Sequence, residues 1–157
     1  MSAFSEIENG LYRWDGVDAD HGFPIVGYVA AIDGGLLLID PPGTSGSVEE
    51  ISKLGVPQAI VVTGKWHVRG AGKWKALLGI PIGAPDTAEG ELAEAGTSAD
   101  VIVGDGYERF GWKAIRFTAG GERRYDEIAL WNAERRAVVI GDLIAMAKDG
   151  QIDYGPH

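Results

Sequence analysis

The 157 residues are enough for one compact domain, and a hydrophobic fraction of 45% with 24% charged residues is ordinary for a chain that buries a core. The 14 basic and 23 acidic side chains give a formal net charge of -9, which repels phosphate backbones and anionic membrane surfaces. We therefore expect neither a nucleic-acid partner nor a membrane partner. Because the chain has no cysteine, disulfides and thiolate metal sites are excluded.

The amino-terminal residues do not resemble a secretion signal. Residues 1–9 carry two glutamates and no basic residue, and no apolar run in the chain approaches the roughly 18 residues that a membrane-spanning helix needs. No linker, low-complexity segment or repeat interrupts the pattern. We expect a single cytoplasmic domain over residues 1–157.

The first half of the chain predicts antiparallel strands followed by alternating helices and strands. Residues 11–14, 25–32 and 36–39 are rich in β-forming side chains, and Asp33-Gly34-Gly35 is a strong hairpin signal. Ser47-Val48-Glu49-Glu50 has the spacing of a capping box, so a helix begins near residue 48 and ends at Gly55.

The next segments continue this alternation. Residues 58–63 are apolar on both faces, which indicates a central strand. A loop over 64–71 precedes a helix, a strand at 81–84 and a short helix that ends near Gly96. Strands are then predicted over residues 101–103, 107–110, 112–117, 127–132 and 137–140. This order predicts an α+β fold with two sheets packed face to face and helices outside, an αββα sandwich.

Six of these segments resemble the metallo-β-lactamase superfamily in their order and rough spacing: residues 26–29, 35–41, 59–63, 80–85, 128–130 and 138–142. The resemblance implies a four-layer αββα sandwich. It also implies a chain shortened at its C-terminus, since relatives usually continue well past the aspartate matched by Asp142, whereas this sequence ends 15 positions later.

The resemblance further implies a metal loop, Thr-His-x-His-x-Asp-His, after the central strand. Here the three histidine places hold Gly64, Trp66 and Arg69, and the aspartate place holds Val68. The next histidine motif corresponds to residues 119–122, which contain none. Only Asp142 matches a metal-bridging carboxylate, and the chain has 3 histidines in all. We therefore expect that the usual dizinc centre is not formed.

The same loop resembles a divergent branch of the superfamily that reads like Thr-Asn-x-Asp-His-x-Arg. His67 and Arg69 match that pattern, whereas Gly64 and Trp66 depart from it. The match supports the fold and implies no particular reaction.

The candidate cleft contains Lys65, Trp66, His67, Arg69 and Asp142. His67 is a general base or lone metal ligand in one interpretation and a hydrogen-bonded loop histidine in the other, which we favour. Lys65 and Arg69 either attract an anion or are scattered surface charges. The bulky Trp66 is expected to fill part of the cleft.

Asp142 is either a metal ligand or the acceptor of a salt bridge. Because a partly buried carboxylate needs a partner, we predict an ion pair between Arg69 and Asp142 in place of a metal. Arg123 and Arg124 follow the other lost ligand position and extend the hypothesis of a basic cluster.

A second acidic run, Asp15, Asp18, Asp20 and His21, lies in a predicted loop. Its spacing fits no complete calcium-binding motif, so we favour a solvated loop.

Three functions remain open. The first is a metal-independent scaffold without a cofactor that binds a small anion or a protein partner. The alternative is a metal-dependent hydrolase with one zinc ion held by His67, Asp142 and a further residue. The third is a structural subunit without a ligand. We also expect a homodimer with residues 127–143 in or beside the contact.

Overall fold

The computed structural model describes residues 3–119, 125–142, 144–146 and 152–154. The strands run in chain order as follows: β1 Phe4–Glu8, β2 Leu11–Val17, β3 Pro24–Ile32, β4 Gly35–Ile39, β5 Pro57–Val61, β6 Ile82–Ala84, β7 Val101–Ile102, β8 Glu108–Arg109, β9 Trp112–Ala119, β10 Tyr125–Asn132, β11 Ala137–Val139, β12 Ile144–Met146 and β13 Ile152–Tyr154. The helices are α1 Val48–Leu54, α2 Ala71–Leu78 and α3 Glu89–Glu94, with short 3₁₀ helices η1 Lys65–His67 and η2 Asp86–Ala88.

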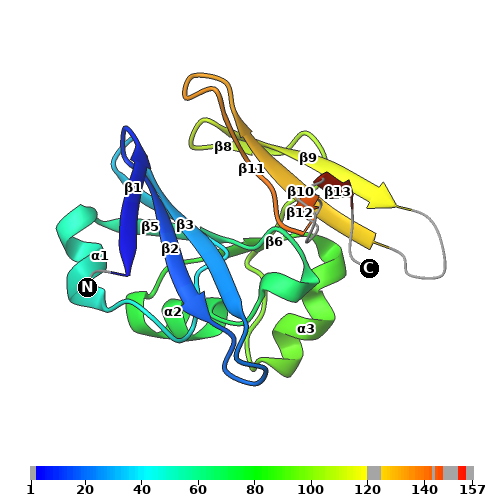
Figure 1. Ribbon diagram of the computed structural model, residues 1–157, viewed down its shortest axis with the longest axis horizontal. Helices are drawn as coiled ribbons and strands as arrows, with labels where there is room; N and C mark the ends of the chain where they lie inside the picture. Colours follow the sequence, from blue (N-terminus) through cyan, green and yellow to red (C-terminus); the bar gives the residue numbers. More distant parts are fainter. Residues whose placement is uncertain (1–2, 120–124, 143, 147–151, 155–157) are drawn as a thin grey trace.

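Seven strands form the larger sheet in the order β1-β2-β3-β4-β5-β6-β7 (Figure 1). Strands β1 to β4 pair antiparallel, and β4 to β7 pair parallel. Because the carboxyl ends of parallel strands meet at one edge of a sheet, the segments that follow β4, β5 and β6 converge there. These segments begin at Asp40, Val62 and Pro85.

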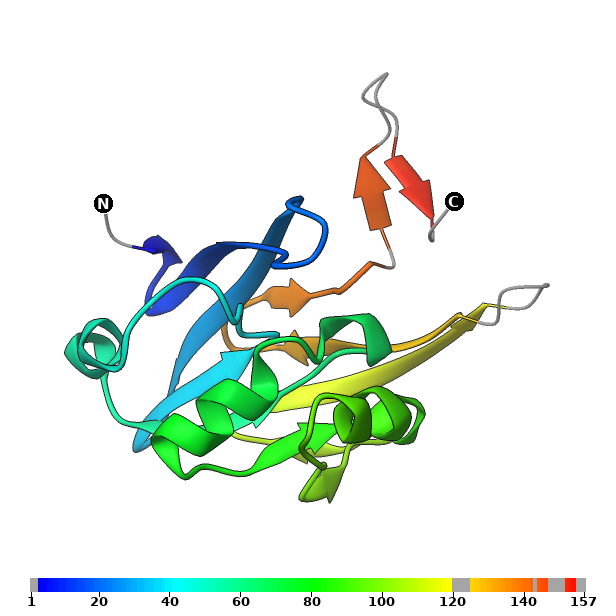
Figure 2. The same cartoon turned by 90° about the horizontal axis from the view of Figure 1, so that it is seen from below.

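The second sheet is antiparallel and has the order β11-β10-β9-β8. It lies across the larger sheet, as the yellow and orange strands of Figure 1 show. Strands β12 and β13 form a separate two-stranded ribbon that projects away from both sheets (Figure 2).

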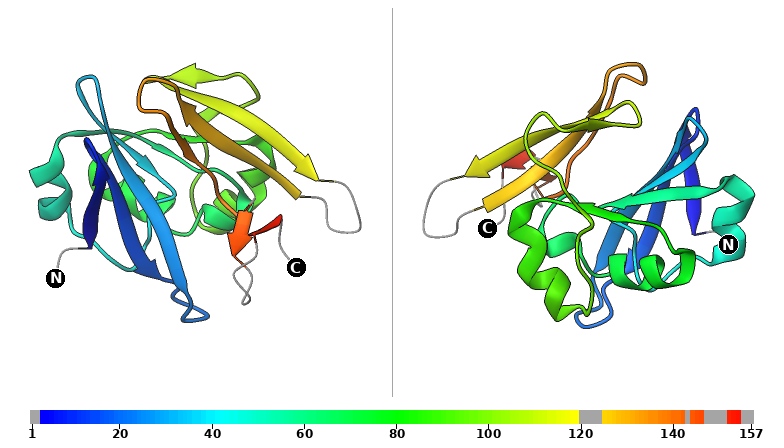
Figure 3. Two further views of the ribbon diagram at one scale, coloured as in Figure 1. Left: turned by 45° about the horizontal axis from the view of Figure 1, so that its top comes forward. Right: turned by 180° about the vertical axis from the view of Figure 1, so that it is seen from behind.

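Successive side chains of β4 point to opposite faces of the larger sheet and belong to two different hydrophobic cores. Leu36 and Leu38 join a cluster with Ile51 of α1, Trp74 of α2 and Leu92 of α3, so these helices cover one face of the larger sheet (Figure 3). Residues of the opposite face join a cluster with side chains of β9, β10 and β11: Leu37, Ile39, Trp112, Ile128 and Val139. One face of the larger sheet therefore packs on helices and the other on the second sheet.

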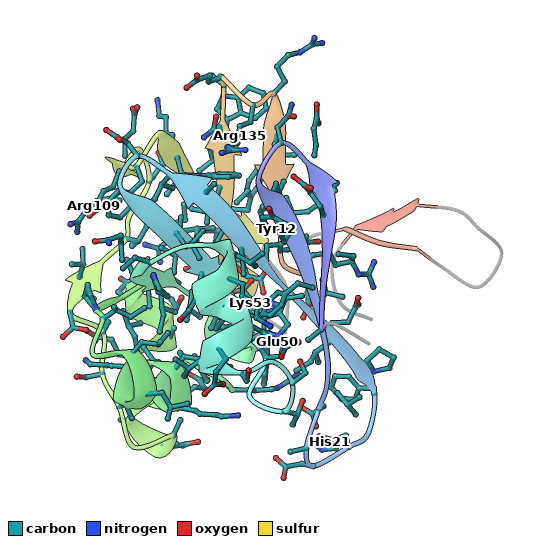
Figure 4. All side chains as sticks on the ribbon, turned by 90° about the vertical axis from the view of Figure 1, so that its left-hand side faces the viewer. Tyr12, His21, Glu50, Lys53, Arg109 and Arg135 are labelled. Atoms are coloured by element: carbon teal, nitrogen blue, oxygen red, sulfur yellow. The ribbon has the colours of Figure 1, made fainter. Side chains whose placement is uncertain are left out.

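Arg135 helps to hold the two sheets together. It lies in the turn between β10 and β11, beside the strands β1 and β2 (Figure 4). Its guanidinium donates to the carbonyl of Asn9 at 2.5 Å and to the carbonyl of Ala31 at 2.6 Å. One side chain of the second sheet thus satisfies two carbonyls of the first.

The αββα prediction is confirmed in its two facing sheets and in the helical layer on the larger sheet. The capping box is also present, because the Ser47 hydroxyl accepts a hydrogen bond from the Glu50 backbone N–H at 3.2 Å. The predicted hairpin turn has Gly34 at a φ of 80°. Strand β1 was not predicted, since its alternation of small, acidic and apolar residues gives a weak pattern.

The outer face of the second sheet carries exposed apolar side chains, namely Ile115, Phe117, Trp131 and Val138. These residues lie on β9, β10 and β11. Trp131 and Val138 fall within residues 127–143, where we expect a dimer contact. The homodimer stays a prediction. Among the described residues, no helix is long and apolar enough to cross a membrane.

Candidate functional site

His67 lies at the carboxyl edge of the parallel strands, at the end of η1, and three carboxylates surround it. Its Nδ1 is 3.7 Å from Asp40 Oδ2. Its Nε2 is 3.3 Å from Glu127 Oε1 and 3.6 Å from Asp142 Oδ2. The imidazole therefore faces Asp40 with one ring nitrogen and the pair of Glu127 and Asp142 with the other.

Asp40 is fixed directly after β4. Its φ of 46° is unusual for a residue other than glycine. Its carboxylate accepts hydrogen bonds from the Thr63 backbone N–H at 2.7 Å and the Thr63 hydroxyl at 2.6 Å. Because these bonds hold the buried carboxylate beside Nδ1, the opposite nitrogen of His67 is directed toward Glu127 and Asp142.

Glu127 enters the site from β10 of the second sheet and is only 1% exposed. A backbone bridge joins Gly64 to Glu127, and the Ile128 N–H donates to the Thr63 carbonyl at 2.8 Å. Glu127 Oε2 accepts a hydrogen bond from the Asp142 backbone N–H at 3.0 Å. Its other oxygen, Oε1, faces His67 Nε2 at 3.3 Å, within ion-pair distance but without the alignment of a hydrogen bond.

The charges of the cluster act on one another. Burial alone would lower the pKa of His67, but Asp40, Glu127 and Asp142 outweigh it and raise that pKa to about 9. Burial raises the pKa of Asp40 above its ordinary value, although His67 and the bonds from Thr63 oppose this shift. In the absence of another cation, a protonated His67 is thus the positive partner of these carboxylates.

The donor atoms are also suited to a divalent cation. One ligand atom each from His67, Glu127 and Asp142 lie within 4.8 Å of one another. Nitrogen and oxygen ligands of one zinc ion lie about 2.0–2.2 Å from the metal, so small side-chain shifts would bring these donors around a single ion. Asp142 is 54% exposed on its side chain, which leaves the cluster open to solvent. The residues therefore fit one ion, which would lie among His67 Nε2, Glu127 Oε1 and the Asp142 carboxylate.

The predicted ion pair between Arg69 and Asp142 is wrong. Arg69 Nε instead contacts Asp18 Oδ2 at 3.0 Å, and its guanidinium lies over the ring of Phe23. Asp142 contacts His67. The physical reason is that the hairpin between β2 and β3 offers a buried carboxylate, only 3% exposed, which needs a cation more than the half-exposed Asp142 does.

Two further residues of the predicted cleft, Lys65 and Trp66, contact each other. Lys65 places its Nζ 4.7 Å from the ring centroid of Trp66, and Trp66 is 48% exposed. Within the part of the chain that the structure describes, no side-chain hydrogen bond or ion pair joins either residue to the His67 cluster. The predicted basic cluster also included Arg123 and Arg124, which lie outside the described residues. Of the predicted site, the structure thus brings together His67 and Asp142.

Asp40 and Glu127 were not predicted as site residues. Both carry a sequence signal, because each is a carboxylate at or within an otherwise apolar strand, where a charge needs a partner. Glu127 begins the run Glu-Ile-Ala-Leu-Trp, and Asp40 follows Leu-Leu-Leu-Ile.

The acidic run of the β2–β3 hairpin is organised around Asp18. Its Oδ1 accepts hydrogen bonds from the backbone N–H groups of Asp20 and His21 and contacts the His21 ring. Figure 4 shows His21 at the tip of this hairpin. Burial works to raise the pKa of Asp18, but the bonds from His21 and the charge of Arg69 outweigh it and hold the pKa below its usual value of 3.8.

We expect Asp18→Asn to destabilise the fold in a pH-dependent way. Because the folded pKa lies below the unfolded one, the ionised carboxylate stabilises the fold above pH 3.8 and loses this effect as the pH falls. Urea unfolding should show a large deficit at about pH 7 and a small one at about pH 3. Asp20→Asn, at the exposed neighbour, should change little at either pH. An equal deficit of Asp18→Asn at both pH values would contradict the expectation.

Solved structures place this arrangement among known folds. The chain aligns with the metallo-β-lactamase DIM-1 at a TM-score of 0.74 and 18% identity, covering 92% of this chain and 71% of that one. A metallo-β-lactamase from Hirschia baltica gives a TM-score of 0.67 and 18% identity over 98% of this chain and 78% of its own. No protein-family model and no curated protein matches the sequence. The chain therefore has the metallo-β-lactamase fold.

Proposed function

We propose that this chain is a metal-dependent hydrolase with a reduced, mononuclear site. The observation that carries the proposal is the convergence of His67, Glu127 and Asp142, whose ligand atoms lie within 4.8 Å of one another. Three carboxylates around one imidazole attract a cation and repel an anion. This arrangement favours the cation over the small anionic ligand that the sequence suggested.

The residues have separate roles in this proposal. His67 Nε2, Glu127 and Asp142 would hold the cation, while Asp40 orients the imidazole through Nδ1. A divalent cation in such a site supplies Lewis-acid polarisation of a substrate oxygen and a water of lowered pKa. The half-exposed side chain of Asp142 is the part of the cluster that solvent reaches.

The metal-independent scaffold remains the second candidate. The specific observation in its favour is that His67, with its pKa raised to about 9, can balance the carboxylates as a protonated imidazole. In that case Glu127 and His67 form a structural ion pair at the junction of the two sheets, and the chain binds a partner elsewhere.

The test is elemental analysis of protein purified without chelators, followed by assays on activated esters and a chromogenic lactam. We expect about one divalent cation per chain, as three protein ligands around one ion imply. Hydrolysis should disappear after chelation and return when the cation is restored. Protein that contains no metal, and whose thermal stability is unchanged by added Zn²⁺ or Mn²⁺, would remove the hydrolase and leave the scaffold.

A further inference from the structure

A hollow lies between the two sheets, beside the edge strand β7, and has a volume of about 470 Å³ when the part open to solvent is included. Its lining is mainly apolar. The larger sheet contributes Ala59 of β5, which carries only a methyl group, and Val101 of β7, and the second sheet contributes Leu130 of β10. As far as the structure describes the chain, no residue of the His67 cluster lines this hollow. It is therefore a separate cavity.

The β8–β9 hairpin supplies another part of the lining, namely Arg109, Phe110 and Trp112. Phe110 and Gly111 form its two-residue turn, with φ values of 56° and 77°. A type I′ turn requires positive φ at both central residues, and a bulky residue rarely takes the first position. Strained backbone of this kind gathers at functional sites such as ligand-binding loops. Phe110 thus adopts an unfavourable backbone conformation while its side chain lines the hollow.

Two polar groups of this hairpin lack a hydrogen-bond or ion-pair partner among the described residues. Trp112 is only 2% exposed, and its buried indole N–H finds no acceptor. A buried donor without an acceptor is rare in folded proteins and calls for an explanation. Arg109 is exposed, lies at the surface in Figure 4 and places its guanidinium 4.6 Å from the ring centroid of Phe110. Both groups are donors, so both are suited to an acceptor from a ligand.

Arg109 and Trp112 lie directly opposite each other on β8 and β9. Side chains of such a cross-strand pair leave the same face of the sheet, with Cβ atoms about 4.5–5.5 Å apart. One carboxylate can therefore accept hydrogen bonds from the guanidinium and from the indole N–H together. Hydrogen bonds to a carboxylate are stronger than those to a neutral acceptor.

We propose that this hollow binds a small molecule that has an apolar body and one carboxylate, such as a short-chain fatty acid. The apolar body occupies the space beside Ala59 and Leu130, where its burial removes apolar surface from water. The carboxylate gives the Trp112 N–H an acceptor and the Arg109 guanidinium an anion. Binding of this ligand requires no cation at the His67 cluster.

The experiment titrates metal-free protein with hexanoate, so that no cation at the His67 cluster can hold the carboxylate. Nuclear magnetic resonance follows the indole N–H signals of protein labelled with ¹⁵N-tryptophan. The chain has 5 tryptophans, and the variants Trp112→Phe and Trp131→Phe each identify one signal by its loss. We expect the Trp112 signal to shift saturably, with a dissociation constant of about 1 mM or lower. The signal of Trp131 should stay in place.

Two matched ligands separate the parts of the molecule that bind. Hexanamide has the same chain length and a carbonyl acceptor but no charge, so it should bind about tenfold more weakly than hexanoate. Acetate keeps the charge and lacks the apolar body, so it should not shift the Trp112 signal at the same concentrations.

Variants then test the two walls. Arg109→Gln removes the guanidinium and should weaken hexanoate binding about tenfold. Lys113→Gln is its control, because it removes the same charge from the exposed residue next to Trp112 on β9, and it should bind as wild type does. Ala59→Leu adds three carbon atoms at the hollow and should abolish binding, while circular dichroism reports whether it folds.

A Trp112 signal that does not move at about 10 mM hexanoate, ten times the expected dissociation constant, would overturn the proposal. Equal binding by Arg109→Gln and wild type would overturn it as well, since the carboxylate would then lie elsewhere, and so would equal binding by a folded Ala59→Leu protein. The wild-type titration and Arg109→Gln decide the matter even if Ala59→Leu does not fold. Because the protein is metal-free throughout, the result does not depend on whether the chain is a hydrolase.

Discussion

Replacing Gly70 with alanine is expected to destabilise the protein and to disturb the His67 cluster at the same time. Gly70 precedes α2 and has a φ of -96°, an ordinary value that alanine adopts freely. Its added Cβ, however, would lie 1.8 Å from the Pro41 carbonyl oxygen and 2.7 Å from the Gly43 nitrogen. Because these are backbone atoms, the two loops themselves must move apart.

Those two loops adjoin Asp40 and His67. One follows Asp40, and the other contains His67, so their separation changes the contact between the two side chains. We expect the free energy of unfolding to fall by about 1–3 kcal/mol or more, the usual effect of overpacking. Cation uptake should weaken in the same variant. Chemical denaturation and Mn²⁺ titration measure the two effects.

Gly90→Ala is the matched control. Gly90 lies in α3, and apart from its chain neighbours and the backbone of its own helix no atom lies within 4 Å of its added Cβ. We expect a gain of about 0.5–1 kcal/mol, because alanine is the better helix former. A Gly70→Ala protein as stable as wild type would show that the loops are not packed as described.

The fold could be predicted from sequence because its local signals agree with one another. Residues 36–39 are all apolar, as expected for a strand buried on both faces, and the structure assigns Leu36 and Leu38 to the helical side and Leu37 and Ile39 to the second sheet. The Ser47 cap and the turn at Gly34 mark boundaries that depend on neighbouring residues alone.

The site was predicted only in part because it depends on distant contacts. His67 and Asp142 were found through a resemblance that names positions in the loop and after the last strands. The resemblance did not indicate Glu127, because this residue reaches His67 only through the backbone bridge between β10 and Gly64. Arg69 was assigned the wrong partner because sequence gives no measure of how deeply Asp18 is buried.

The second large effect is expected at Trp74, whose replacement by alanine should lower the free energy of unfolding by about 3–5 kcal/mol. Trp74 is fully buried in α2 and packs edge-on against Trp14, with ring centroids 5.0 Å apart. Its indole N–H also donates to the Pro42 carbonyl at 2.7 Å. Alanine would remove the ring contact and the hydrogen bond together.

Comparison of two further variants separates these contributions. Trp74→Phe keeps an aromatic ring but leaves the buried Pro42 carbonyl without its donor, so it should lose about 1–3 kcal/mol. Trp66→Ala removes an indole that is 48% exposed, and should change stability by about 0.5 kcal/mol or less. Urea denaturation of Trp74→Ala, Trp74→Phe and Trp66→Ala measures the free energy of unfolding of each variant, and the losses should decrease in that order.

The position of Pro42 connects this core residue to the site. Pro42 lies two residues after Asp40. The hydrogen bond from the Trp74 indole to the Pro42 carbonyl therefore anchors the chain just after Asp40 to the helix α2. If that anchor matters, Trp74→Phe should weaken Mn²⁺ uptake although it changes no charged group, because Asp40 would no longer hold His67 in one orientation. Unchanged uptake in a destabilised Trp74→Phe protein would show instead that the two bonds from Thr63 suffice to place Asp40.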